Sequence, residues 1–127
     1  MYQEIELIGN VGKNGVELRY TPDGKPVANF SMAVNEKVGD KKLTAWFRIS
    51  VWNRQAETCN QYLKTGSLIM VKGRLRFDEA TGGPRLYKRQ DGTEGASFEV
   101  SASTVRFIGG KDASEQPTNA PDEDIPF

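Results

Sequence analysis

The segment formed by residues 43–52 alternates strictly from one side chain to the next, and this alternation constrains the fold more than any other stretch. One row is entirely apolar and holds Leu43, Ala45, Phe47, Ile49 and Val51. The opposite row holds Thr44, Trp46, Arg48, Ser50 and Trp52. Because successive side chains of a strand point to opposite faces, the segment predicts a β-strand with one face toward a core.

Four further strands are predicted around this one. An opening strand covers residues 4–11 and resumes, bent, at 16–20; the others cover 27–34, 69–76 and 98–107. The apolar phase shifts midway through 98–107, which predicts a β-bulge. Loops are expected at 35–42 and 78–95, and the second is expected to contain a small hairpin near 85–88 with a turn at Asp91-Gly92.

One helix is predicted at residues 54–64, where Ala56, Cys59 and Leu63 fall on one stripe. Asn53 is the expected N-cap and Gly66 the expected stop. Five strands with one helix between the third and the fourth is the order of an OB-fold. The predicted fold is therefore all-β: a five-stranded OB-fold barrel with one short helix between strands 3 and 4, followed by a disordered acidic C-terminal tail.

The content of histidine and cysteine excludes several classes of catalytic and metal site. The chain has 127 residues, no histidine and one cysteine. A His-based triad, an internal disulfide and a zinc site are therefore not expected. A metal or acid site made of carboxylates alone is the alternative, but no paired carboxylates stand out, and neither a metal nor another cofactor is predicted. No membrane span or secretory signal is expected, and the single cysteine fits a reducing, cytoplasmic compartment.

The net charge of zero is divided unevenly along the chain. Residues 1–110 hold 16 Lys and Arg against 12 Asp and Glu, a net charge of +4. Residues 111–127 hold one Lys against five Asp and Glu, a net charge of −4. This predicts two parts: a mildly basic domain at 1–110 that binds a polyanion, and a linker with an acidic tail at 111–127.

The polar row of the central strand is the candidate binding surface. Trp46 and Trp52 lie on the face away from the predicted core, where exposure of two large apolar rings to water is costly unless a ligand or another chain covers them. They predict a platform on which bases stack, and a subunit interface is the structural alternative. Phosphates are expected to contact five cations: Arg48, Arg54, Lys72, Arg74 and Arg76. Phe77 has the parity of the core row but follows the strand, so it faces either the core or a ligand.

The last six residues form a second candidate site, made of Asp122, Glu123, Asp124, Ile125, Pro126 and Phe127. Three carboxylates precede an apolar end that carries the terminal carboxylate. Solubility explains the acidic residues but not Ile125 and Phe127. The segment therefore predicts a docking peptide for a basic-rimmed apolar pocket on another protein, and a solubilising tail is the alternative.

Taken together, these features resemble the bacterial-type single-stranded DNA-binding protein (SSB) family. The likeness covers nearly the whole chain, including residues 5–12, 18–20, 27–30, 44–48, 62–67, 71–75 and the Asp-Glu-Asp-Ile-Pro-Phe end. The resemblance implies a non-enzymatic protein that coats single strands in replication, recombination and repair. It also implies that the tail recruits genome-maintenance proteins, that the protein associates with the nucleoid, and that four chains assemble as a homotetramer.

The chain also departs from the family pattern. Where the family often has a further tryptophan after the second strand, Val38 stands nearby, and Glu79 and Ala80 stand where another often follows the fourth strand. Two other interpretations of the sequence are less well supported. An accessory primosomal adaptor with an OB-fold is disfavoured by the acidic end, and an enzyme is disfavoured by the lack of a nucleophile–base pair or a metal cluster.

Overall fold

The computed structural model describes residues 1–109, and within this range it contains seven strands and one helix. They are β1 (Ile5–Val11), β2 (Glu17–Tyr20), β3 (Pro26–Val38), β4 (Lys41–Trp52), α1 (Arg54–Tyr62), β5 (Leu68–Arg76), β6 (Arg85–Lys88) and β7 (Glu94–Gly109). The predicted linker and acidic tail, and Gly110 at the predicted boundary, lie outside the described residues.

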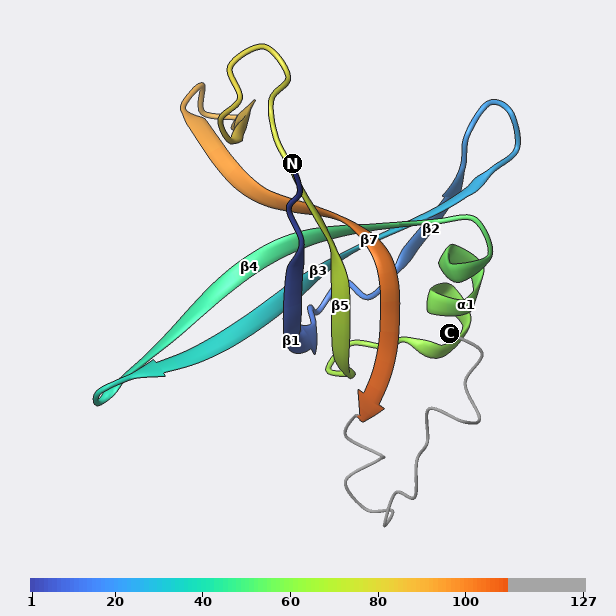
Figure 1. The fold of residues 1–127 in the computed structure, drawn as a ribbon, viewed down its shortest axis with the longest axis horizontal. Helices are drawn as coiled ribbons and strands as arrows, with labels where there is room; N and C mark the ends of the chain where they lie inside the picture. The colour runs from blue at the N-terminus through green and yellow to red at the C-terminus, as the bar shows by residue number, and fades with distance from the viewer. Residues whose placement is uncertain (110–127) are drawn as a thin grey trace.

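Five of the strands close into a barrel (Figure 1). Their order is β1-β5-β7-β4-β3, and β3 pairs with β1 to complete the circle. All of these pairings are antiparallel except that of β4 with β7. β1 and β2 both pair with β3, as predicted for a bent first strand. The predicted five-stranded OB-fold barrel is therefore confirmed.

Glycine allows two strands to approach closely where the barrel curves. A Cβ on Gly73 of β5 would lie 2.2 Å from the carbonyl oxygen of Ser101 on β7. At the same place the register shifts, because Lys72 pairs with Thr104 whereas Gly73 pairs with Ala102. One extra residue of β7 is left between these pairs, which is the predicted β-bulge. The bulge explains why the apolar phase of the last strand changes.

The barrel interior is filled by the apolar rows that alternation predicts. Met32, Ile49, Ile69, Val71 and Val100 are fully buried there. The helix α1 packs against β2, β3 and β4; it adds Ala56 and Cys59 to this core, and Leu63 directly after the helix also belongs to it. It ends two residues before the predicted end, and Asn53 occupies the N-cap position without a side-chain capping bond. Among residues 1–109, no helix is long and apolar enough to cross a membrane.

Besides the hairpin between β2 and β3, two hairpins extend from the barrel as arms (Figure 1). The first is the β3–β4 arm, which we define as residues 33–46. A loop was predicted at 35–42, and this was wrong: the strands stay paired as far as Val38 and Lys41. Gly39, with φ of 62°, makes the tight turn. Main-chain pairing does not require apolar side chains, so a polar sequence can remain a strand when both of its faces are exposed.

The second arm is formed by β6 and the first residues of β7. Arg85 pairs with Ser97 and Lys88 with Glu94, so the predicted hairpin is confirmed. The turn includes Gly92 with φ of 88°. β7 thus runs from this arm into the barrel, where it becomes the partner of β4. The two arms diverge from the place at which β4 and β7 first pair (Figure 1).

Candidate nucleic-acid interface

The outer face of β4 carries the predicted tryptophans. Trp46 is 56% exposed and Trp52 is 41% exposed, whereas Ile49 and Val51 on the other face of β4 are buried. They are six residues apart on one strand, which corresponds to about 20 Å at the usual rise per residue. One nucleotide cannot span this distance, so a ligand that contacts both rings has to be longer than one nucleotide.

Trp46 is held against the sheet by a glycine on a neighbouring segment. Gly12 follows β1, and its amide donates a hydrogen bond of 2.7 Å to the carbonyl oxygen of Ser31 on β3. A Cβ at Gly12 would lie 3.2 Å from Cζ3 of Trp46. The edge of the indole therefore packs where a larger residue would interfere. This contact orients the ring while more than half of it stays exposed.

A charged row crosses the outer face from β4 to β5. In register, Arg48 of β4 lies beside Glu99 of β7, and Glu99 lies beside Arg76 of β5. Glu99 also forms an ion pair of 3.8 Å with Arg85 of β6, and its carboxylate accepts a 3.2 Å hydrogen bond from the Ser97 hydroxyl. One carboxylate thus lies among three arginines, and within residues 1–109 neither Arg48 nor Arg76 forms an ion pair with a carboxylate.

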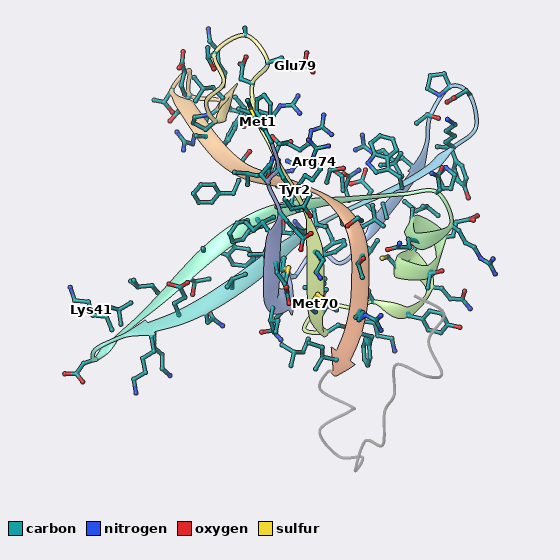
Figure 2. All side chains as sticks on the ribbon, in the orientation of Figure 1. Met1, Tyr2, Lys41, Met70, Arg74 and Glu79 are labelled. Carbon is teal, nitrogen blue, oxygen red and sulfur yellow. The ribbon has the colours of Figure 1, made fainter. Side chains whose placement is uncertain are left out.

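The other predicted cations differ in their surroundings. Arg74 is exposed and pairs in register with Ser101, and Figure 2 places it near Tyr2 at the upper end of β5. Arg54 begins α1, two residues after Trp52. Lys72 forms an ion pair of 3.7 Å with Glu4. The structure therefore brings Arg48, Arg74 and Arg76 onto one surface with the tryptophans, whereas Lys72 already has a partner.

Phe77 follows β5 and is exposed rather than part of the core. It lines a cavity of about 310 Å³ together with Phe98 and Pro84. Of the two orientations left open by the sequence, the one away from the core is found. Arg76 lines the same cavity, so a ligand there would meet a cation as well as aromatic rings.

Sequence reasoning missed two aromatic residues at the base of the arms. Phe98 and Tyr87 line a cavity of about 680 Å³ together with Trp46, Phe47 and Arg48. Phe98 was placed at the start of a strand, and Tyr87 within a small hairpin, without a role for either. The sequence would have pointed to these two residues only if the pairing of β7 with β4 had been known, because that pairing places them beside Trp46.

The remaining reactive group lies in the core. Cys59 of α1 is fully buried, and burial raises the pKa of its thiol to about 12. The thiol is therefore protonated at neutral pH and does not provide a thiolate nucleophile. Within residues 1–109, no cluster of three or more His, Cys, Asp or Glu side chains is arranged to hold a metal ion.

Comparison with known proteins agrees with this geometry. The model of the single-strand binding protein family matches residues 2–108. A single-stranded DNA-binding protein of Neisseria meningitidis serogroup A is 32% identical over 126 residues, which covers 95% of this chain and 67% of the relative. The chain belongs to the single-strand binding protein family. Single-stranded DNA-binding protein 1 of Synechocystis sp. is 31% identical over 122 residues, covering 94% of this chain and 95% of the relative.

A solved structure supports the fold independently of close sequence similarity. The small single-stranded DNA-binding protein from Streptomyces coelicolor superposes with a TM-score of 0.71 at 22% identity. The match covers 84% of this chain and 94% of that one. The family membership confirms the resemblance inferred from the sequence, and the superposition confirms the barrel.

Proposed function

We propose that this chain binds single-stranded DNA without regard to sequence and protects it during replication, recombination and repair. The observation that carries the proposal is the exposure of Trp46 and Trp52 on the outer face of β4, beside Arg48. Aromatic faces accept any base by stacking, and cations meet the phosphates of every nucleotide. Membership of a single-strand binding family supports the same ligand.

Intrinsic fluorescence provides the test, because the chain has only two tryptophans. Titration with single-stranded oligonucleotides of dT, dA and dC should quench the emission, and the three should bind with similar affinity. A duplex of the same length is the matched control and should quench much less. The proposal fails if no single-stranded oligonucleotide quenches the emission at low salt, where phosphate contacts are strongest.

We further propose that residues 122–127 recruit replication, recombination and repair proteins. The proposal rests on the sequence alone, because these residues lie outside the described part of the chain. Phe127 would fill an apolar pocket while its terminal carboxylate meets a basic group of the partner. Asp122, Glu123 and Asp124 would speed the encounter, so docking should weaken with salt.

A pull-down from bacterial lysate, cleared of DNA, tests this recruitment. Full-length protein should retain nucleases, helicases and polymerase subunits, and a chain lacking residues 122–127 should lose them. Phe127→Ala should reproduce most of that loss, because the ring is the apolar anchor. A tail with the same six residues in scrambled order is the matched control for charge. Equal recovery by all four proteins would mean that the tail is only solubilising.

The same deletion should leave DNA binding intact or slightly tighter. Five of the 17 carboxylates follow Gly110, and they can compete with DNA for the basic face. We place this activity at the nucleoid in the cytoplasm, where the proposed ligand is found. Weaker DNA binding after the deletion would contradict competition and would assign the tail a direct part in binding.

Assembly into a homotetramer completes the proposal. Each chain contributes one barrel, and the outer face of β1 and β5 carries Ile8, which is largely exposed and lies opposite Met70 in register. Ile8 and the half-buried Met70 would form the apolar part of a subunit contact on this face. The mass in solution decides the point: four chains are expected, and a monomer at micromolar concentration would contradict it.

A further inference from the structure

Phe98 occupies an unusual position on β7. It lies on the side of the strand that faces the core, because its register partner is Phe47 and the next residue on that side, Val100, is fully buried. Its ring is nevertheless 54% exposed. The ring stacks on Phe47, with centroids 5.4 Å apart and an interplanar angle of 29°. Phe98 is therefore a firmly backed aromatic surface that the barrel does not cover.

The place where the arms diverge leaves space beside this ring. β4 pairs with β7 only over residues 47–50, and before this point β4 pairs only with β3 while β7 pairs with β6. The 680 Å³ cavity lies at this notch, and Trp46 of β4 and Tyr87 of β6 both line it. Phe98 lines this cavity and also the 310 Å³ cavity that contains Phe77. One ring therefore borders two adjoining cavities.

We propose that Phe98, backed by Phe47, is a third base-stacking position, and that a single strand passes through the notch from Trp46 across Phe98 toward Phe77. This inference rests on the proposed function. Nucleic acid is favoured over a peptide or a second chain because aromatic rings on separate elements border one path. A stacked base needs such a ring, whereas its sugar and phosphate need cations beside it.

The charges along the path fit a polyanion. Arg48 lies at the rim of the first cavity and Arg76 at the second, and neither is ion-paired within the described residues. Within residues 1–109, Arg85 has one ion pair, with Glu99 at 3.8 Å, and it lies near the surface, where an ion pair contributes little. A phosphate can therefore replace that carboxylate as the partner of Arg85. The cavity volumes lie within the range usual for ligand sites.

Substitution of the ring tests the inference in the full-length chain. Phe98→Ala should weaken oligo-dT binding roughly tenfold, which is within the range for loss of one stacked base. Phe98→Leu should weaken binding similarly, although the leucine still covers Phe47. Phe98→Trp should bind oligo-dT as tightly as the unmodified chain, because it keeps an aromatic ring. Leu86→Ala is the matched control, because Leu86 is 61% exposed on the neighbouring strand and lines neither cavity. Unchanged affinity of Phe98→Ala and Phe98→Leu would overturn the inference.

A local probe gives a second readout that does not depend on affinity. With Trp46→Phe and Trp52→Phe in place, Phe98→Trp introduces one tryptophan at the proposed position, and Leu86→Trp introduces one at the control position. Oligo-dT should quench the probe at 98 and leave the probe at 86 nearly unchanged. Absence of quenching at 98, at oligo-dT concentrations where anisotropy of a labelled oligonucleotide shows that the probe protein is bound, would overturn the inference alone. Absence of quenching in the unmodified chain as well as in the probe protein would instead overturn the proposed function.

Two further outcomes identify other occupants of the notch. If emission of the probe at 98 changes on dilution together with the mass in solution, a second copy of the chain covers Phe98. If it changes on deletion of residues 122–127 in the absence of DNA, the tail covers it. Either result, combined with no response to oligo-dT, overturns the assignment of Phe98 to base stacking.

Discussion

Residues 47–52 of β4, the barrel half, pair with β3 and, at residues 47–50, also with β7, whereas residues 41–46, the arm half, pair with β3 alone. Both halves have the same alternation of side chains. In the barrel half Ile49 is 0% exposed, and in the arm half Leu43, from the same row, is 49% exposed. The difference shows that alternation defines which side chains share a face, while the neighbouring strands decide whether that face is covered.

The outer face of β4 does not follow this division. Trp46 belongs to the half that extends into the arm and Trp52 to the half inside the barrel, yet both are substantially exposed. The barrel half therefore combines a buried inner face with an outer face that we propose to bind DNA. The arm half has no covered inner face, so its contribution to function is expected to exceed its contribution to stability.

Paired substitutions on the inner row provide the largest test of this comparison. Ile49→Ala should lower the free energy of unfolding by about 2–5 kcal/mol, because it leaves a cavity among fully buried neighbours. Leu43→Ala should lower it by about 0.5 kcal/mol or less, because half of that side chain is already in water. Denaturant unfolding monitored by circular dichroism measures both. Equal losses would mean that the arm is packed as tightly as the barrel, for example against a second chain.

On the outer face, both halves should instead behave alike. Trp46→Ala and Trp52→Ala should each weaken single-strand binding by about 1–3 kcal/mol, with little dependence on the base, because stacking does not discriminate between bases. Fluorescence anisotropy of labelled oligonucleotides measures the change. The platform assignment fails if both variants are folded and bind with unchanged affinity, and a changed oligomeric mass would then favour the subunit-interface alternative.

The salt dependence of binding separates free cations from paired ones. Arg74→Ala and Arg76→Ala should each reduce the slope of log affinity against log salt by about 0.7, the contribution of one phosphate contact on a single strand. Lys72→Ala should change it less, because Lys72 is paired with Glu4 at 3.7 Å. Arg48→Ala and Arg54→Ala complete the set of predicted contacts. An unchanged slope for all five variants would show that the basic residues are only a solvated surface.

The smallest expected effect is a gain of affinity. Glu99→Gln removes the carboxylate that lies beside Arg48 and Arg76 in register and is ion-paired with Arg85. Binding should tighten by about twofold to fivefold at low salt, because repulsion of phosphates is removed and an arginine is released. The same titrations measure it. Weaker binding would indicate that Glu99 positions the arginines, and not that it competes with phosphate.

Much of the barrel could be predicted because its signals are local. The rows of β3, β4 and β5, the stripe of α1 and the phase shift in β7 are all visible as periodic patterns. Loop 35–42 was predicted wrongly because polarity was taken as a sign of irregular structure. In the protein, Gly39 makes a tight turn and cross-strand hydrogen bonds continue along both sides of it.

The candidate site was predicted unevenly for the same reason. Trp46, Arg48 and Trp52 lie on one strand, so their common face follows from a period of two. Phe98 and Tyr87 join them only through long-range pairing of β7 with β4 and with β6. The parallel pairing of β4 with β7 connects segments about 50 residues apart, and no local pattern specifies its register.

The sequence by itself determined which faces of the strands are apolar, where the helix lies and which tryptophans point away from the core. Those properties depend on the geometry of consecutive residues. Only the tertiary structure decided how far β4 is covered, that Glu99 lies among three arginines, and that Phe98 borders the notch beside Trp46. These depend on where distant strands meet and separate, and that point is set by closure of the whole barrel, with Gly73 allowing β5 and β7 to approach.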